Sequence, residues 1–558
     1  MNASYIEYSE TNSFSPSVIS YIEGDEKLNP FISQKPTIDG FRNLLANKKV
    51  IADRTVLTDT LKKQYSTLVT TTSEIANQPF TGTEANLNNP PESSQNNLVI
   101  SNINLLEQPG TYTITTGHQL NIFTGPLYFI FKITTAIKLA QDLKKEFPEK
   151  NFVPVYWMAT EDHDFEEINH THIGGKKISW PKDAAGATGR LKTDDIQHAL
   201  KEYTRVLGIS ENALTLSNLV KTAYSAHSNL SDATRFLANS LFGEYGLVII
   251  DADHPDFKKQ FASYIEKDII TQSSFENINN QSDKLEKIGF ETQVNSREIN
   301  FFYLRDNLRE RIVLENSKYS VLNTDLSFTE EELKKEIQNH PERFSPNVVM
   351  RPLYQEVILP NIAYVGGGAE IIYWLQLKQN FDQYKVDFPI LILRNSAMLT
   401  DYTLKSKLQK LDLEISDFFK QTNELEKTWV VNHSKNTLDL HDEWQKLKCI
   451  FEKIKLRAHK IDVTLSPSTE AVKVRLHKAI INLEKKLIKA EKRNYSDSLN
   501  QIKNIKNRLF PQGGLQERSE NFGLFYVKNG DDLIKSLVEN FHPLDFKFTI
   551  LQEKARAH

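Results

Sequence analysis

Four short apolar segments in the first 400 residues constrain the fold of this chain more than any other feature. Each is rich in β-branched and aromatic residues, and helical periodicity fills the stretches between them. The segments are 111–115, 152–159, 246–253 and 388–394. Because strands that alternate with helices form parallel sheets, the sequence predicts an α/β fold with a Rossmann-type parallel sheet core.

The uneven intervals between these segments indicate insertions. Residues 165–245 contain glycine-rich stretches and then helical patterns, whereas 285–350 includes the alternating segments 298–304 and 311–314. Such alternation is typical of antiparallel strands with one solvated face. At 558 residues the chain is also too long for one compact core. We therefore expect a core over 1–400, with insertions at about 165–245 and 285–350.

Beyond residue 400 the composition becomes that of long helices. Glycine is absent from 401 to 512, where Lys, Glu and Leu dominate. A heptad seam with spacings 4, 3, 4, 3 runs through Leu476, Ile480, Leu483, Leu487 and Ala490. We expect a helical coiled-coil arm over 401–510 and a C-terminal segment, 511–558, that packs back on the core with a strand at 548–551. An exposed seam needs a partner, so we expect a homodimer through the arm. The alternative is a helical bundle packed on the core.

Composition excludes several classes of protein. Cys449 is the only cysteine, which rules out an internal disulfide and a cysteine-rich zinc site. The net charge of −4 gives no global basic field for nucleic acid or acidic membranes. No stretch reaches the roughly 18 apolar residues of a membrane span. Residues 1–29 do not read as a secretory signal. We expect a cytoplasmic protein without nucleic-acid or membrane partners.

The first candidate site lies where segment 111–115 turns toward an apolar helical run, 127–143. Gly117, His118 and Gln119 stand at this turn, and Thr124 and Gly125 follow. Strand, glycine turn and helix is a local geometry that binds phosphates, through backbone N–H groups at the helix N-terminus. We expect Gly117, Gln119, Thr124 and Gly125 to bind a nucleotide. His118 is a candidate catalytic residue that stabilises developing charge, or else a histidine that caps the helix.

The second candidate site follows the segment 152–159. Residues 161–164 read Glu-Asp-His-Asp, and Asn169 comes soon after. Ligands bind at the carboxyl ends of parallel strands, so this cluster and the Gly117 turn should face one crevice. We predict that Asp162, His163 and Asp164 act as general base and orienting groups, and that Glu161 and Asn169 bind substrate. A divalent metal is an alternative use of such ligands, but we expect none.

The third candidate site is a run of three glycines, Gly366, Gly367 and Gly368, before a helical pattern. Consecutive glycines allow a ligand to approach the backbone, so we assign them to cofactor binding. Glu370 would lie in the first helical turn, where it opposes a phosphate but could hold a substrate amine. Arg351, which precedes this run, is a further candidate for substrate binding.

These motifs together resemble those of the bacillithiol biosynthesis cysteine-adding enzyme family, BshC. The similar segments are 115–119, 124–128, 153–157, 161–169, 351–355 and 509–518. They run in order along nearly the whole chain, and Glu-Asp-His-Asp-Phe at 161–165 is the most specific. Gln is familiar in this family where His118 stands, which argues against an indispensable role for His118.

The resemblance implies a Rossmann-type core with connecting-peptide insertions, like that of class I aminoacyl-tRNA synthetases, and a coiled-coil arm used for dimerisation. It also implies the reaction, which is addition of cysteine to the amine of glucosaminyl-malate in the last step of bacillithiol synthesis. By analogy with the cysteine ligase of mycothiol synthesis, we hypothesise an ATP-dependent (or ADP-linked) route through a cysteinyl-adenylate. If a metal selects the thiol, His163 and Asp164 would have to hold it. The alternatives are a nucleotidyltransferase or ligase for another amino acid, and a non-catalytic dimeric scaffold with a degenerate Rossmann core.

Overall fold

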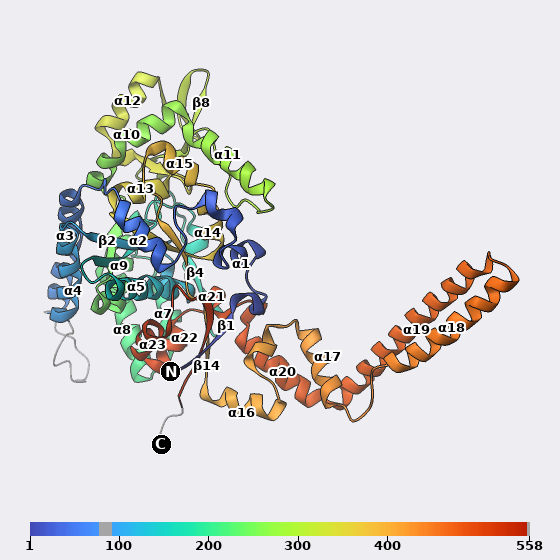
Figure 1. The fold of residues 1–558 in the computed structure, drawn as a ribbon. Helices are drawn as coiled ribbons and strands as arrows, with labels where there is room; N and C mark the ends of the chain where they lie inside the picture. The colour runs from blue at the N-terminus through green and yellow to red at the C-terminus, as the bar shows by residue number, and fades with distance from the viewer. Residues whose placement is uncertain (77–91, 555–558) are drawn as a thin grey trace. The chain divides into compact units, whose positions relative to one another are not determined.

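The computed structural model describes residues 1–76 and 92–554, and a parallel sheet lies within the first 400 residues (Figure 1). Within the described residues the sheet has five strands, in the order β13-β12-β2-β3-β6, and every neighbouring pair is parallel. The strands are β2 (Thr111–His118), β3 (Asn151–Met158), β6 (Val248–Asp251), β12 (Asn361–Gly366) and β13 (Ile390–Leu393). The predicted α/β class is therefore confirmed, as are all four strands predicted from apolar segments.

β12 is the strand that the sequence did not predict, although it lies between β13 and β2 and is buried along its whole length. Its apolar run is short and continues directly into Gly366–Gly368, which the sequence pattern places before a helix. The glycines do precede a helix, α14 (Gly368–Leu375). They therefore lie at the carboxyl end of a central strand, beside the end of β2.

Helices cover both faces of the sheet, and neighbouring side chains of β3 contact helices on opposite faces. Neighbouring residues on a strand point to opposite faces. Tyr156 packs against Phe129 of α5 (Tyr128–Glu146), whereas Trp157 packs against Tyr354 of α13 (Arg351–Ile358). α2 (Ile38–Asn47) adds Phe41 to the α5 side. A strand buried on both faces needs a nearly continuous apolar sequence, which is what made β3 predictable.

The first insertion follows β3. It contains α6 (Phe165–Ile168), the hairpin β4 (His170–Ile173) and β5 (Lys176–Ser179), and the helices α7 (Gln197–Leu207), α8 (Glu211–Ala226) and α9 (Leu230–Phe242). Its apolar side chains share one buried cluster with α22 (Gly523–Asn529) and α23 (Asp532–Asn540). The C-terminal segment thus completes the core of this insertion. After β6 the chain continues through α10 (Pro255–Thr271) and α11 (Ser273–Lys287).

The second insertion is an antiparallel sheet, as its alternating sequence predicted. The strand order is β10-β9-β8-β7-β11. Its elements are β7 (Phe301–Arg305), β8 (Leu308–Glu315), β9 (Lys318–Val321), β10 (Ser327–Phe328), α12 (Glu330–Asn339) and β11 (Phe344–Pro346). A third sheet joins β1 (Asn2–Glu7), β15 (Lys547–Gln552) and β14 (Ala397–Thr400), which confirms the strand predicted at 548–551.

Two compact units divide the described chain. The first comprises Met1–Ser9, Ser13–Leu399 and Gly514–Glu553, and it contains the three sheets above and the hairpin. Its remaining helices are α1 (Pro16–Ile22), α3 (Arg54–Ala76), α4 (Glu92–Leu105), α15 (Lys378–Tyr384) and α21 (Gln516–Ser519). No helix in residues 1–76 or 92–554 is long and apolar enough to cross a membrane.

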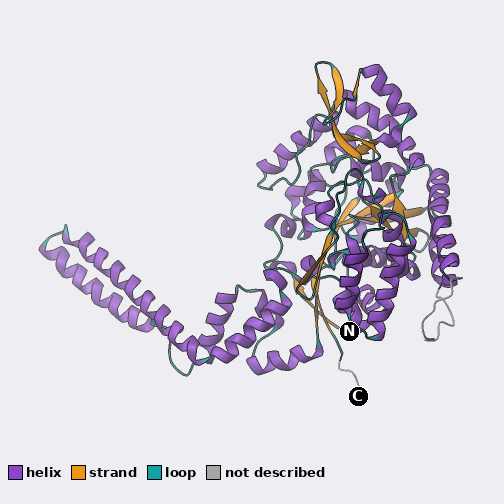
Figure 2. Cartoon of the chain, turned by 180° about the vertical axis from the view of Figure 1, so that it is seen from behind, coloured by secondary structure: helices purple, strands orange, loops and turns teal. Residues whose placement is uncertain are grey.

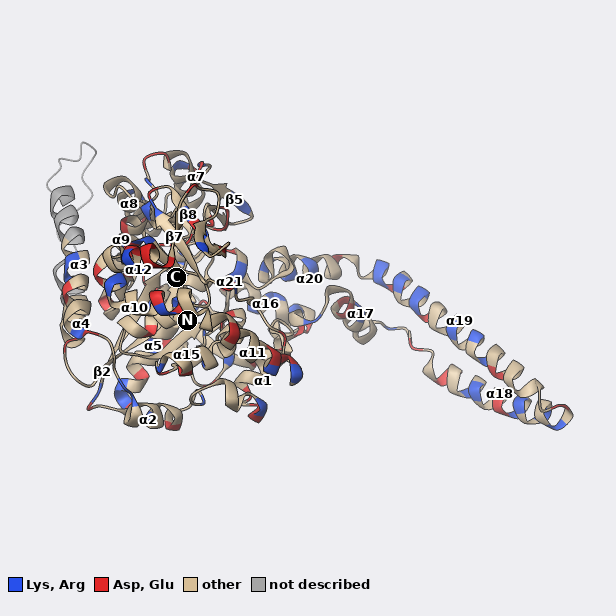
Figure 3. Ribbon diagram, turned by 90° about the horizontal axis from the view of Figure 1, so that it is seen from above, with Lys and Arg blue, Asp and Glu red and all other residues tan. Residues whose placement is uncertain are grey.

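The second unit, mainly Thr400–Gly513, is helical, as predicted (Figure 2). It consists of α16 (Tyr402–Leu411), α17 (Thr422–His433), α18 (His441–Ile461), α19 (Leu465–Asn494) and α20 (Ser496–Leu509). α18 and α19 form an antiparallel pair, joined by ion pairs such as Lys455–Glu470 at 2.9 Å and lined by charged side chains (Figure 3). The predicted seam is partly wrong, because Leu483 is exposed whereas Ile488 and Glu491 are buried.

Candidate active site

A cavity of about 870 Å³ lies at the carboxyl ends of β2, β3 and β12. Gly117 and His118 of β2, Trp157 and Met158 of β3, and the residues after β12 line one part of it. The inserted antiparallel sheet lines another part with Phe302, Arg309 and Arg311. Open parallel sheets bind their ligands at this edge, so this cavity is the candidate active site.

Gly117 brings the end of β2 close to two side chains from other elements. A Cβ at Gly117 would lie 3.3 Å from the Tyr364 hydroxyl and 3.6 Å from Nη1 of Arg351. The first distance is tighter than ordinary van der Waals contact. The glycine therefore serves close packing of Arg351 and Tyr364 against the strand, in addition to any contact with a ligand.

Lys132 and Glu370 form an ion pair at this strand end, in which the lysine is buried and the Glu370 side chain is 26% exposed. Nζ of Lys132 lies 2.7 Å from Oε1 and 3.0 Å from Oε2 of Glu370, and it also donates to the Gly117 carbonyl. Glu370 further accepts from the Tyr364 hydroxyl at 2.7 Å and from the Gly367 N–H at 3.0 Å. Burial alone would raise the pKa of Glu370, but Lys132 and these hydrogen bonds hold it below its ordinary value. Both carboxylate oxygens are thus engaged, although Glu370 and Gly367 still line the cavity.

Arg351 presents a buried donor to the cavity. Its Nη1 donates to Oε1 of Gln355 at 3.1 Å, and its guanidinium lies 6.0 Å from the Trp157 ring and 5.7 Å from the Tyr364 ring. Nη2 is buried and has no hydrogen-bond partner at normal distance within the described residues, although the guanidinium also interacts with the Tyr373 hydroxyl. An unpaired buried guanidinium nitrogen is costly, and a carboxylate or phosphate oxygen would satisfy it.

His118 lines the cavity but is packed as an aromatic ring. Its imidazole lies 5.3 Å from Tyr128 and 5.2 Å from Phe129, measured between ring centroids. Burial, with a smaller contribution from Lys132, lowers the pKa of His118 to about 3. The ring is therefore neutral at physiological pH, which does not suit a general acid. Its Nε2 is buried and unpartnered among the residues described.

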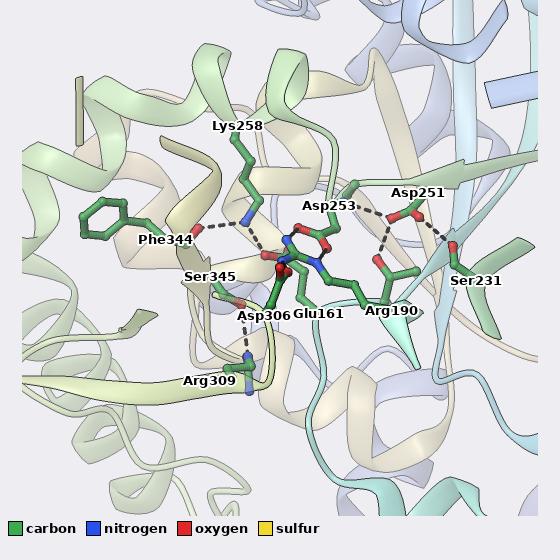
Figure 4. Close-up of polar contacts among 12 residues, drawn as sticks. Glu161, Arg190, Ser231, Asp251, Asp253, Lys258, Asp306, Arg309, Phe344 and Ser345 are labelled. Carbon is green, nitrogen blue, oxygen red and sulfur yellow. Dashed lines mark hydrogen bonds and ion pairs between the residues drawn. The ribbon is translucent and has the colours of Figure 1, made fainter. Parts of the chain in front are cut away.

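Only part of the acidic cluster at 161–164, which follows β3, lines the cavity. Glu161 and Asp162 line the cavity. Oδ2 of Asp162 accepts from Nε2 of Gln119 at 2.7 Å, which connects two of the predicted sites directly. Glu161 pairs with the buried Lys258, whose Nζ also donates to the Phe344 carbonyl at 2.7 Å (Figure 4).

His163, Asp164 and Asn169 are not among the described residues that line the cavity. The Asp164 side chain caps α6, with Oδ1 accepting from the Glu167 N–H at 3.3 Å. Oδ1 of Asn169 lies 3.0 Å from Nδ1 of His170. Nδ1 of His163 lies 2.6 Å from Nη1 of Arg309. The structure therefore gives each of these side chains a partner within the protein.

Thr124 and Gly125 also lie away from the cavity lining, in the turn before α5. Thr124 has φ 71° and Gly125 has φ 62°. Nδ2 of Asn521 donates to the Gly125 carbonyl at 2.8 Å, and the Leu127 N–H donates to the Glu520 carbonyl at 2.8 Å. The C-terminal segment thus occupies the start of α5, which we had expected to bind phosphate. Gly366 packs against Tyr364 and Glu370, whereas Gly367 and Gly368 line the cavity.

A second group of acids, which belongs to none of the motifs seen in the sequence, supports the ends of β3 and β6 (Figure 4). Asp251 accepts from the hydroxyls of Thr160 and Ser231, each at 2.6 Å. Asp253 accepts two hydrogen bonds from Arg190, at 2.8 and 3.0 Å. Burial and the nearby Glu161 raise the pKa of Asp253 to about 6. The sequence showed that the third segment ended in acids, but it gave no sign of their partners.

The cavity is strongly basic, which the sequence also did not reveal. Its described lining contains seven cationic side chains against three acidic ones, Glu161, Asp162 and Glu370. The cations are Lys132, Arg297, Arg309, Arg311, Arg351, Arg394 and Arg518. They come from six separate stretches of a chain whose net charge is −4, so no local run of charge could have predicted their convergence. Within the described residues, no group of three or more His, Cys, Asp or Glu side chains is placed to hold a metal ion.

Comparisons with known proteins agree with this architecture. A family model described as the N-terminal Rossmann-like domain of bacillithiol biosynthesis BshC matches residues 85–395. A second, described as the C-terminal coiled-coil domain of bacillithiol biosynthesis BshC, matches residues 397–553.

Curated relatives match over nearly the full length. A protein of Flavobacterium psychrophilum named "Putative cysteine ligase BshC" is 44% identical over 98% of this chain and 99% of its own. A protein of Flavobacterium johnsoniae with the same name is 42% identical over 98% of this chain and 99% of its own. A Bacillus cereus protein with that name is 29% identical over 81% of this chain and 87% of its own.

Proposed function

The chain belongs to the bacillithiol biosynthesis BshC family, and from this premise we propose that it is a ligase that joins L-cysteine to the amine of glucosaminyl-malate. The product is bacillithiol. The observation that best supports the proposal is the basic cavity at the carboxyl edge of the parallel sheet. Cysteine, glucosaminyl-malate and ATP all carry carboxylates or phosphates, which guanidinium groups bind well.

We propose an ATP-dependent route in two steps. A carboxylate oxygen of cysteine attacks the α-phosphorus of ATP, and pyrophosphate leaves. The amine of glucosaminyl-malate then attacks the cysteinyl carbon, and AMP leaves with the oxygen that cysteine had supplied. The amine loses one proton in this second step. Binding and orientation of both substrates in one cavity supply much of the catalysis in such a reaction.

Several candidates from the sequence line the cavity, which supports roles for them in this route. We assign Asp162 as the acceptor of the amine proton, because its carboxylate faces the cavity and Gln119 holds it in place. Arg351 would bind a substrate carboxylate through Nη2. Gly117, Gln119, Gly367 and Gly368 line the cavity, and we assign them to binding of the nucleotide. We assign Thr124, Gly125, Asp164 and Asn169 to support of these elements, from the contacts described above.

We further propose a cytoplasmic homodimer that associates through the helical unit. α18 and α19 expose apolar side chains, which include Ile450, Ile454, Leu456 and Leu483. Exposed apolar patches rimmed by charge mark association surfaces.

Purified protein assayed with cysteine, glucosaminyl-malate and ATP tests the proposal. Bacillithiol, measured by mass spectrometry, should form only when all three are present. D162N should lose most turnover while it still binds glucosaminyl-malate. Product without any nucleotide would contradict the adenylate route. Absence of product with every nucleotide and amino acid tried would instead favour a scaffold.

A further inference from the structure

His163 and Arg309 make a contact that fixes the protonation state of the histidine. Nη1 of Arg309 lies 2.6 Å from Nδ1 of His163. An arginine can only donate hydrogen bonds, so Nδ1 must accept. His163 is then neutral and carries its proton on Nε2. A histidine held in this way has no free Nδ1 with which to take a proton from a substrate.

Arg309 is a cavity residue, and several elements hold it in place. Its guanidinium lies 4.0 Å from the Phe302 ring of β7. It donates to the Ser345 hydroxyl at 3.1 Å and to the Pro346 carbonyl at 3.4 Å, both on β11. His163 adds a contact from the turn after β3, which belongs to the parallel sheet core. The pair therefore joins the inserted sheet to the strand end that carries Glu161 and Asp162.

We propose that His163 is a positioning residue, which acts through Arg309 to hold that guanidinium at the cavity wall for an anionic group of a bound substrate. This rests on the proposed ligase function for the identity of the substrate. The anion is a carboxylate or phosphate, because a guanidinium recognises both in the same manner.

Acid should break the contact. Protonation would put two cations 2.6 Å apart. The other charged groups near His163 are Asp162, whose Oδ1 lies 3.7 Å from Nδ1, Asp164 from the same turn, and Glu310 of β8. Burial and Arg309 lower the pKa of His163, and these three carboxylates oppose the shift. Substrate affinity should therefore be constant at neutral pH and fall in acid as His163 becomes protonated.

Kinetics with matched variants separate positioning from catalysis. H163N keeps an acceptor near the position of Nδ1, whereas H163Q moves it to the position of Nε2 and H163A removes it. H163A and R309Q should each raise the KM of one substrate about 10- to 100-fold, the value of a charge-assisted hydrogen bond, with little change in kcat. The double variant should be no worse than R309Q, and H163N should recover most of the affinity that H163A and H163Q lose. A collapse of kcat at unchanged KM, or additive losses, would overturn the proposal.

Nuclear magnetic resonance of histidine-labelled protein tests the contact without any assay of turnover. The wild type should show the Nε2–H tautomer of His163 and a pKa below the ordinary value. In R309Q that pKa should rise. An Nδ1–H tautomer with the same pKa in both proteins would overturn the proposal. If the protein gave these signals but made no bacillithiol, the ligase function would be refuted. The contact between His163 and Arg309 would still stand.

Discussion

Arg351 has one guanidinium nitrogen that is held within the protein and a second that could bind a ligand. Gln355 fixes one of its terminal nitrogens, and the other is buried without a hydrogen-bond partner at normal distance in the described chain. R351K keeps the charge but loses the planar fork, so we expect the KM of an anionic substrate to rise about 10- to 100-fold. R343K is a suitable control, because Arg343 pairs with Glu336 beside the inserted sheet. Equal kinetics for R351K and wild type would show that Nη2 binds no substrate.

Glu356 should make stability depend on pH. Burial raises the pKa of this side chain to about 7, despite the nearby Lys48 and hydrogen bonds from Asn361 and Gln355. A carboxyl whose pKa is raised in the folded state stabilises it at pH below the unfolded value of 4.5, and that stabilisation is lost as pH rises through 7. The full effect is about 3 kcal/mol. Between pH 5 and 8 the free energy of unfolding should therefore fall less in E356Q than in wild type. The midpoint of urea unfolding at each pH measures this difference. Parallel curves for the two proteins would contradict this.

At the scale of elements, Lys132 and Glu370 join α5 to α14 beside β2. K132M leaves the carboxylate of Glu370 without its cation, and because that side chain is 26% exposed the variant should lose about 3 kcal/mol, the lower end of the cost for a buried pair. K132M/E370M should recover part of that loss in thermal unfolding. The exposed pair Lys334–Glu330 on α12 provides the control, and K334M should cost less than about 1 kcal/mol. Similar melting of K132M and K334M would show that the Lys132–Glu370 pair does not stabilise the core.

Elements were predictable where local pattern and burial agree. β2, β3, β6 and β13 are apolar runs between turn residues, and a strand buried on both faces requires such a run. β12 was missed because its run ends in three glycines that resembled a ligand loop. The seam on α19 was only partly right, since Leu483 is exposed whereas Glu491, an acid, is buried. Periodicity alone does not show which face a partner helix covers.

The sequence predicts only those parts of the candidate site that follow directly on a predicted strand. Gly117, Gln119 and Asp162 meet at one edge because the carboxyl ends of parallel strands must. The side chains from distant segments that contact these residues could not be predicted from the sequence. Lys258 engages Glu161 across 97 residues, and Arg309 engages His163 across 146. The second contact engages Nδ1 of His163, one of the catalytic candidates in the sequence, with a cationic side chain that no local pattern could reveal.

At the scale of the whole molecule, we predict that the helical unit carries the dimer contact. Ile450 and Ile454 lie one turn apart on α18 and are 50% and 43% exposed. I450E/I454E should shift the protein from dimer to monomer in analytical ultracentrifugation, because buried charge opposes association. L214E, at a residue 52% exposed on α8, is the matched control and should remain dimeric. A monomeric wild type, or a dimeric double variant, would exclude this contact.

Transfer of oxygen from cysteine to AMP is the most direct test that the protein is an ATP-dependent cysteine ligase. Cysteine labelled with ¹⁸O in its carboxyl group is incubated with the enzyme, ATP and glucosaminyl-malate, and the nucleotide is analysed by mass spectrometry. An adenylate route yields AMP that carries one ¹⁸O atom, formed in equal amount with bacillithiol. Bacillithiol accompanied by unlabelled nucleotide, or by no nucleotide cleavage, would contradict it.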